Sequence, residues 1–353
     1  MSDEADNTSD NTSDNTSINT AANEAANVEN APSEDARSPS AADEGAVPVG
    51  GYSHTEPFEL QSFPPLPPPL PPPFPYRRPP LDWPSFRTPN FADFGLFMGL
   101  LILGFLVASG AVGMALYFHW FGLRNFNDVQ NSTGVSLGTQ VLIYLVALVV
   151  AIPFFRAVWG RGFFDGIHWH FATAFRLRYR LVWTAVLCNV IAMLGNAFLP
   201  FPQHAPIDKL FGTSNDAWML MAFGVTVAPF FEEMIFRGFL MPALATAWDW
   251  FAERSTGSPP RPLDAAGNPV WSGFAAVFAA MTASVPFAWM HSEQVGRAWG
   301  PLLLLYCVSL ILCTVRLVTR SLAASTLTHS AYNFLLFAMM FWQTGGFRHM
   351  DKM

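Results

Sequence analysis

The sequence predicts an all-α membrane protein, a multi-pass transmembrane helical bundle of about seven spans behind a disordered N-terminal tail. Hydrophobic residues make up 51% of the 353 residues and charged residues only 13%, whereas an ordinary soluble domain is about 25% charged. Seven apolar runs reach the roughly 20 residues that a bilayer crossing requires. One run contains Glu232, Glu233 and Arg237, and ionisable residues inside a span are costly unless they serve a function.

The first 63 residues predict a disordered acidic tail, rich in Asn, Ser and Ala. Residues 1–60 carry 13 acidic residues and one basic residue, so the net charge of −7 divides into −12 for this segment and +5 for the remainder. Such a composition cannot bury enough apolar surface to offset the entropy of the chain. The acidity therefore belongs to the tail, and we see no basic surface that would indicate a nucleic-acid partner.

Residues 64–90 predict a proline-rich spacer beside the membrane. The sequence PPLPPPLPPPFPYRRPP at 64–80 favours polyproline II, a semi-rigid conformation without internal hydrogen bonds. The same tract meets the PxxP spacing several times. A partner that binds proline-rich motifs, of the SH3 or WW kind, is the alternative to a simple spacer.

The transmembrane helical domain is predicted at 91–345, followed by a short C-terminal tail at 346–353. Each span should cross a bilayer of ordinary thickness. The expected spans are about 93–120, 138–158, 180–200, 217–245, 272–293, 299–318 and 321–343.

Basic residues indicate which side of the bundle faces the cytoplasm. The connections on the side of the N-terminus collect twelve arginines, namely Arg77, Arg78, Arg87, Arg156, Arg161, Arg176, Arg178, Arg180, Arg254, Arg261, Arg316 and Arg320. The opposite side has Arg124, Lys209, Arg297, Arg348 and Lys352. By the positive-inside rule the N-terminus is cytoplasmic. We expect a multi-pass integral protein of a bacterial inner membrane.

Two further polar spots lie in apolar surroundings. One is His291, four residues after Phe287, and the other pairs His329 with Asn333. Residues four apart on a helix project from one face about one turn apart. His329 and Asn333 are therefore expected to act together.

The same helical spacing separates the charged residues into a pair and a single carboxylate. Glu233 and Arg237 are also four apart, which permits an ion pair within one helix that offsets part of the cost of burial. Glu232 would point about 100° away from Glu233. This leaves Glu232 for another task.

Glu232, His291, His329 and Asn333 could converge between helices in two ways that both lead to hydrolysis. A carboxylate desolvated among apolar groups suits a general base that activates a water molecule. The same four side chains could instead bind a divalent metal that activates the water. The sequence leaves both routes open.

The three motifs together resemble the signature of the CPBP family of intramembrane proteases. They occur in family order as Glu232-Glu233-x-x-x-Arg237, Phe287-x-x-x-His291 and His329-x-x-x-Asn333. The resemblance covers about residues 217–340, the expected protease core. The family includes the eukaryotic enzymes that trim prenylated CaaX proteins and bacterial proteins linked to bacteriocin self-immunity.

The resemblance implies a role for each residue. Glu232 would activate the attacking water with His291 as its partner, and His329 and Asn333 would bind a metal or stabilise the oxyanion. The supporting residues would be Glu233, Arg237 and Phe287.

The resemblance also implies a substrate and a cofactor. The substrate would be a membrane-associated peptide or protein, such as a lipid-modified, CaaX-like tail. The family is described both as glutamate protease and as metalloprotease, so one divalent metal is implied, with zinc as a candidate. Zinc does not follow from spacing, because the sequence lacks His-Glu-x-x-His.

Two other function classes stay open. Midplane carboxylates and histidines also occur in ion- or proton-coupled transporters, although no second copy of the Glu-Glu segment indicates a repeat. The third class is a non-catalytic membrane scaffold acting through the proline-rich tail.

The expected spans raise one geometrical difficulty. Straight helices would place Glu232 near the middle of the membrane and His291 near the outer end of its span. A break at Pro286, or a shift of that span along the sequence, would bring the histidine inward. The long connection at about 249–270 could form a cytoplasmic flap.

Overall fold

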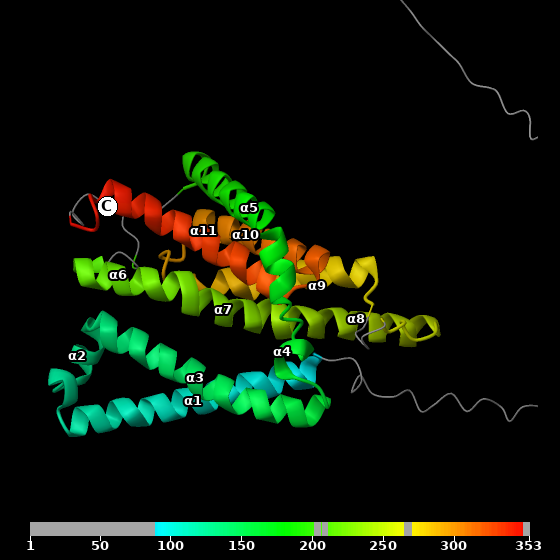
Figure 1. Cartoon of the computed structure of the whole chain (residues 1–353), viewed down its shortest axis with the longest axis horizontal. Coiled ribbons are helices and arrows are strands. Elements are labelled where there is room, and N and C mark those ends of the chain that lie inside the picture. The colour runs from blue at the N-terminus through cyan, green and yellow to red at the C-terminus, as the bar shows by residue number, and fades with distance from the viewer. Residues whose placement is uncertain (1–88, 201–205, 207–210, 265–269, 349–353) are drawn as a thin grey trace, which may run out of the picture. The chain divides into compact units, whose positions relative to one another are not determined.

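The computed structural model describes residues 89–200, 206, 211–264 and 270–348. The predicted tail, the polyproline tract and residues 349–353 lie outside these residues, as does the 265–269 part of the expected flap. In the described part of the chain the regular elements are helices, which confirms the all-α fold class (Figure 1).

The helices follow one another with short connections. Their bounds are α1 (Phe91–Tyr117), α2 (Phe126–Asn131), α3 (Thr133–Trp159), α4 (Phe163–Gly166), α5 (Phe171–Phe198), α6 (Ser214–Ala222), α7 (Ala228–Glu233), α8 (Met241–Thr256), α9 (Gly273–Met290), α10 (Trp299–Thr319) and α11 (Leu322–Gln343). A 3₁₀ turn at Trp120–Gly122 follows α1.

Two π-helical segments join α6, α7 and α8 into one rod. They span Phe223–Val227 and Met234–Leu240, and the rod runs for 43 residues from Ser214 to Thr256. At 1.5 Å per residue it is about 65 Å long, well beyond the roughly 30 Å of a hydrocarbon core. π-Helical turns inside α-helices are rare and concentrate at functional sites.

Six helices of the described residues are long and apolar enough to cross a membrane. They correspond to the first six predicted spans. The seventh, α11, is 22 residues long but is not among the six. Polar residues on its buried part, including Thr328 and His329, account for this, because they lower its mean hydropathy while facing protein and not lipid.

Helices α1 and α3 pack against each other as a hairpin, with one close contact at Gly104 and a hydrogen bond at the start of α1. Gly104 of α1 lies against the Ile143 backbone so closely that a Cβ atom would not fit, the kind of contact that small residues allow between membrane helices. At the start of α1 the buried Asp93 caps the helix together with Asn90 and accepts a hydrogen bond from Trp159 Nε1 at 3.0 Å.

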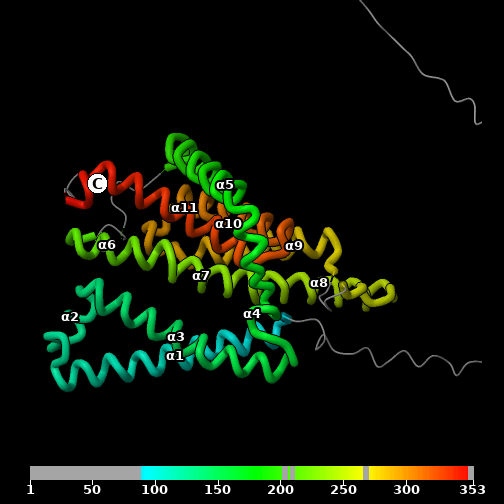
Figure 2. Tube along the Cα trace, viewed as in Figure 1, coloured from blue at the N-terminus to red at the C-terminus, as the bar shows by residue number. Residues whose placement is uncertain are grey.

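Aromatic rings join this hairpin to the long rod. Phe97 of α1 stacks on Phe239 at 4.4 Å between centroids, and Tyr144 of α3 stacks on Phe231 at 4.2 Å. Phe155 of α3 belongs to the same buried cluster. On the other face of the rod, α5 packs along α11 and α9 lies between α8 and α10 (Figure 2).

The turn between α10 and α11 is fastened to the segment before α5. The Leu322 amide donates to the His168 carbonyl at 2.9 Å, and the Ser321 hydroxyl donates to the His170 carbonyl at 2.9 Å. Arg316, counted above with the basic connections, is only 2% exposed and donates to His168 Nδ1 at 3.1 Å. It is therefore a structural residue of α10 and not a contact to headgroups.

Candidate active site

The two adjacent glutamates of α7 face different surroundings. Glu233 is fully buried, whereas the side chain of Glu232 keeps 13% of its surface exposed. π-Helical turns lie on both sides of this short helix, so its residues are rotated relative to those of α6 and α8. The rod thus presents one carboxylate to the protein interior and the other to a partly open space.

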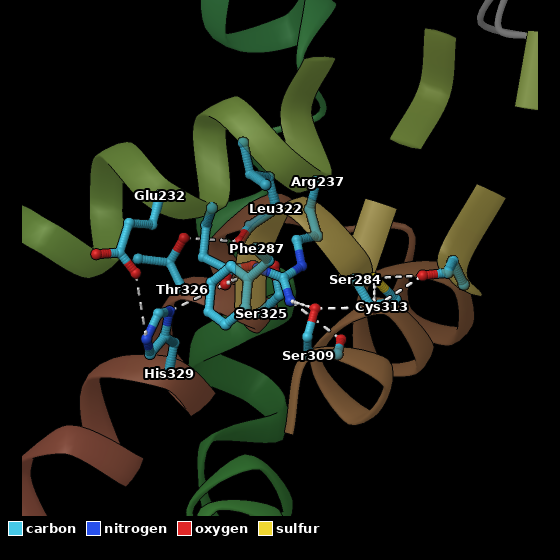
Figure 3. A network of polar contacts seen from close by, with 12 residues as sticks. Glu232, Arg237, Ser284, Phe287, Ser309, Cys313, Leu322, Ser325, Thr326 and His329 are labelled. Carbon is cyan, nitrogen blue, oxygen red and sulfur yellow. Dashed lines mark hydrogen bonds and ion pairs between the residues drawn. The ribbon is translucent and has the colours of Figure 1, made fainter. Parts of the chain in front are cut away.

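Glu233 forms an ion pair with Arg237 across one helical turn. Arg237 Nη1 donates to Glu233 Oε1 at 3.0 Å, and both side chains are completely buried. Arg237 Nη2 donates to the Ser309 carbonyl at 3.0 Å and to the Ser309 hydroxyl at 2.6 Å (Figure 3). Three charge-assisted hydrogen bonds thus hold the guanidinium, and this offsets part of the cost of burying it.

The Phe287 ring lies at the centre of the site. The Arg237 guanidinium carbon is 4.3 Å from the ring centroid, a cation–π contact that is stronger when it is desolvated. The same ring borders His291 and His329, with centroids 5.1 and 5.8 Å apart. Phe287 therefore fixes the positions of an arginine and two histidines by packing.

Both histidines direct a ring nitrogen at Glu232. His329 Nε2 lies 3.7 Å from Glu232 Oε2, and His291 Nε2 lies 3.9 Å from the same oxygen. These separations exceed the length of a direct hydrogen bond. The three groups are therefore adjacent but not bonded to one another.

The other ring nitrogens determine the tautomers. His291 Nδ1 lies 2.9 Å from the Phe287 carbonyl oxygen, which can only accept, so Nδ1 carries the hydrogen. His329 Nδ1 lies 3.0 Å from Glu233 Oε1, a carboxylate oxygen already paired with Arg237, and it donates there for the same reason. In the neutral rings both Nε2 atoms are then acceptors that face Glu232.

The end of α9 explains how His291 reaches Glu232. The helix is 18 residues long and runs through Pro286 without a break; it ends at Met290, and His291 is its C-cap. Of the two alternatives considered for bringing His291 inward, the break at Pro286 is therefore wrong. A short helix followed by the turn at 291–297 brings the histidine to the carboxylate, and the expected span at 272–293 ends three residues early.

Asn333 lies one turn after His329 on α11, and its amide serves the π-helical segment. Its Nδ2 donates to the Gly224 carbonyl at 2.7 Å. Within the rod this carbonyl has lost its usual donors, because the Ala228 amide bonds to Phe223 and Pro229 has no N–H. Asn333 thus pairs a carbonyl that the π-helical turn exposes.

The fit of a metal can be tested on the side chains that the sequence proposed as ligands. Among the described residues no group of three or more His, Cys, Asp or Glu side chains is placed to hold a metal ion. The Asn333 amide nitrogen is directed at Gly224, which leaves its Oδ1 as the atom that a metal would use. A divalent metal at this site stays a prediction.

Two serines of the site were not among the sequence candidates. Ser309 of α10 donates to Ser284 of α9 at 2.8 Å, and Ser284 donates to the Ala280 carbonyl at 2.8 Å. A signal for Ser284 is present in the sequence, since Ser284, Phe287 and His291 have the i, i+3, i+7 spacing of one helix face. Nothing comparable marks Ser309, which only the packing of α10 brings to Arg237.

Comparison with known proteins gives one result. Residues 214–335 match the family model described as type II CAAX prenyl endopeptidase Rce1-like. The match confirms the family resemblance predicted from the three motifs, and it includes every residue of the site described above. No match was found among curated proteins or solved structures.

Proposed function

We propose that this chain, whose residues 214–335 match the Rce1-like type II CAAX prenyl endopeptidases, is an intramembrane endopeptidase in which Glu232 activates the attacking water. One observation carries the proposal. The largely buried carboxylate of Glu232 faces two imidazole nitrogens at 3.7 and 3.9 Å without bonding to them. A water oxygen lying between these groups can be within hydrogen-bond reach of each.

The first chemical step is proton transfer and attack. Glu232 takes a proton from the water while the water oxygen forms a bond to the carbonyl carbon of the substrate. His291 Nε2 accepts a hydrogen bond from the remaining O–H of that water, which orients its lone pair toward the carbonyl. A positioned general base contributes about 10²- to 10⁴-fold to such a rate.

The second step is collapse of the tetrahedral intermediate. The C–N bond breaks, and the proton held by Glu232 passes to the departing nitrogen, so that Glu232 returns to its charged form. Asn333 uses one amide N–H for the Gly224 carbonyl; its second N–H is the donor that we assign to the oxyanion. Preorganised donors of this kind contribute about 3–4 kcal/mol to catalysis.

The substrate that we propose is a membrane-associated protein or peptide with a lipid-modified, CaaX-like tail. The family description supports this class, and the apolar surroundings of the site suit a segment that reaches it from the bilayer. We further propose a bacterial inner membrane with the N-terminus in the cytoplasm, which rests on the distribution of arginines. A divalent metal, with zinc as first candidate, stays a prediction that elemental analysis of the purified protein tests.

The test of the function is cleavage by purified full-length protein in detergent. The probe is a quenched-fluorescent peptide ending in a farnesylated CaaX tetrapeptide. We expect cleavage by the wild type and a loss of about 10²- to 10⁴-fold in kcat for Glu232→Gln. Glu293→Gln is the matched control, because Glu293 is an exposed glutamate in the turn after His291 and its loss should leave kcat unchanged.

The same preparation separates the enzyme from a transporter or a scaffold. Absence of Glu232-dependent cleavage, together with a Glu232-dependent ion current in liposomes, would replace the endopeptidase by the transporter. Cleavage that is equal in wild type and Glu232→Gln protein would leave this site without a catalytic role.

A further inference from the structure

A polar pair on α3 lies beside the active site, although α3 is outside the residues that match the family model. The ring of Tyr144 stacks on Phe231 with 4.2 Å between centroids and 12° between planes. Phe231 immediately precedes Glu232 in α7. Helix α3 therefore holds a tyrosine against the short helix that carries Glu232.

Gln140 determines how this hydroxyl is used. Its side-chain Nε2 donates to the Tyr144 oxygen at 3.0 Å from one turn earlier on α3. Because the phenol oxygen accepts from Gln140, the phenol hydrogen is left to donate to a different group. No acceptor for it is found among the described residues, while the carbonyl oxygen of Gln140 adds an acceptor beside it.

Gln140 and Tyr144 lie within a membrane-crossing helix, where polar groups that serve only a structural role are costly in free energy. Helix α3 is one of the six helices of the described residues that are long and apolar enough to cross a membrane, and Gln140 is exposed on it. Polar side chains within a span are commonly directed at a substrate pathway or a partner. Tyr144 stacks on Phe231 of α7, and Leu137 of α3 packs against the buried cluster that contains Ala217 of α6, so the residues on either side of Gln140 on this face of α3 contact the rod.

We propose that Tyr144, oriented by Gln140, binds the substrate backbone: its hydroxyl donates a hydrogen bond to a peptide carbonyl next to the scissile bond, in a segment lying between α3 and α7. The inference rests on the proposed endopeptidase function. A peptide segment opened for cleavage has carbonyl and amide groups without helical partners, and in an apolar environment each needs a protein partner. Tyr144 and Gln140 offer a donor and an acceptor side by side.

The experiment measures kcat and KM separately with the farnesylated CaaX peptide. Tyr144→Phe keeps the ring that stacks on Phe231 and removes only the hydroxyl. We expect KM to rise about 3- to 10-fold, the effect of one hydrogen bond, with kcat within about twofold of the wild type. Gln140→Met, which keeps the length of the side chain, should raise KM about 2- to 5-fold.

The matched control is Tyr179→Phe. Tyr179 also accepts a hydrogen bond on its hydroxyl, from Arg178 Nη2 at 3.3 Å, but it lies on α5 and is 70% exposed. Its substitution should leave KM unchanged. Thermal unfolding of each purified variant in detergent shows whether a change in KM comes from a folded protein.

The outcomes separate the two proposals. Wild-type cleavage with unchanged KM in folded Tyr144→Phe protein would overturn the binding role of Tyr144 and leave the endopeptidase intact. A fall in kcat at constant KM would also overturn it, because a residue that binds the substrate ground state acts on KM. A wild-type protein without Glu232-dependent cleavage would overturn the endopeptidase and, with it, the role of Tyr144.

Discussion

The two sides of α7 carry similar polar and ionisable groups, which are in direct contact on one side and farther apart on the other. On one side lies the charge network, which we define as Glu233, Arg237, Ser309 and Ser284; its contacts measure 2.6–3.0 Å, and all four residues are fully buried. On the other side lies the histidine cluster of Glu232, His291 and His329. Its separations are 3.7 and 3.9 Å, and its glutamate is partly exposed.

The difference supports separate roles for the two carboxylates. In the charge network Glu233 and Arg237 compensate each other, so the pair is stable and has little capacity to react. In the histidine cluster no arginine or lysine of the described part of the chain pairs with Glu232, and the space between the groups suits a small reactant. His329 connects the two sides, since its Nδ1 donates to Glu233 while its Nε2 faces Glu232. The charge network therefore positions the histidine cluster.

The largest expected effect comes from breaking the charge network at Arg237. Arg237→Met should lower the free energy of unfolding by about 3–5 kcal/mol, because it leaves the Glu233 carboxylate buried without its cation. The double variant with Glu233→Gln should recover part of this loss. Unfolding of the detergent-solubilised protein by increasing SDS, followed by circular dichroism, measures both.

Arg297 provides the matched control for this variant. It pairs with Glu293 at the same four-residue spacing and at 2.6 Å, but its side chain is 72% exposed. Arg297→Met should cost at most about 0.5 kcal/mol. Equal losses for Arg237→Met and Arg297→Met would show that burial does not distinguish the two ion pairs.

An intermediate effect is expected at Asn333. Asn333→Ala leaves the Gly224 carbonyl without a donor and should cost about 1–3 kcal/mol in stability. If the second amide N–H serves the oxyanion, kcat of the folded variant should also fall about 10²- to 10³-fold. The first effect is measured by SDS unfolding and the second with the farnesylated peptide.

Pro229 tests the reason given for the Asn333 contact. Pro229→Ala restores a backbone N–H to the rod at the position that a π-helical bond to Gly224 requires. Combined with Asn333→Ala, it should return at least about 0.5 kcal/mol of stability and none of the lost kcat. Stability that stays at the level of Asn333→Ala alone would refute the account of the exposed carbonyl.

The smallest effect is expected at Ser284, the last residue in the chain of contacts that begins at Glu233. Ser284→Ala removes the acceptor of the Ser309 hydroxyl and should cost about 1 kcal/mol, with kcat within about threefold. Thr314→Val on α10 is the control, because the Thr314 hydroxyl donates to the Leu310 carbonyl of its own helix on an exposed face. A loss in kcat for Ser284→Ala as large as that for Glu232→Gln would give the serine a direct catalytic role.

Much of the fold and part of the site follow from local sequence. Apolar runs predict α1, α3, α5, α9 and α10 because hydrophobic length is a property of the segment alone. The spacing of Glu233 and Arg237 predicts their ion pair for the same reason, since both lie on one helix. The motif resemblance, which the family match at 214–335 confirms, named the remaining candidate residues but gave no distances or contacts between them.

Contacts between helices could not be predicted in this way. The sequence suggested a break at Pro286, whereas α9 passes through it and ends before His291. Arg316 looked like one more arginine of a connection, yet it is buried against His168. In both cases the outcome depends on where a neighbouring helix lies, and no pattern within the segment carries that information.

The sequence by itself determined which polar and charged residues lie in apolar surroundings, and it predicted that Glu232, His291, His329 and Asn333 form a site. Only the tertiary structure decided what each side chain contacts. The Phe287 carbonyl and the Glu233 carboxylate fix the tautomers of the two histidines, and Asn333 pairs the π-helical carbonyl. Tyr144, which lies outside the motifs, stacks beside the site. The physical reason is the distance over which each effect acts. The cost of burying a charge is set by the span that contains it, whereas hydrogen bonds act over about 3 Å and exist only after packing has brought donor and acceptor together.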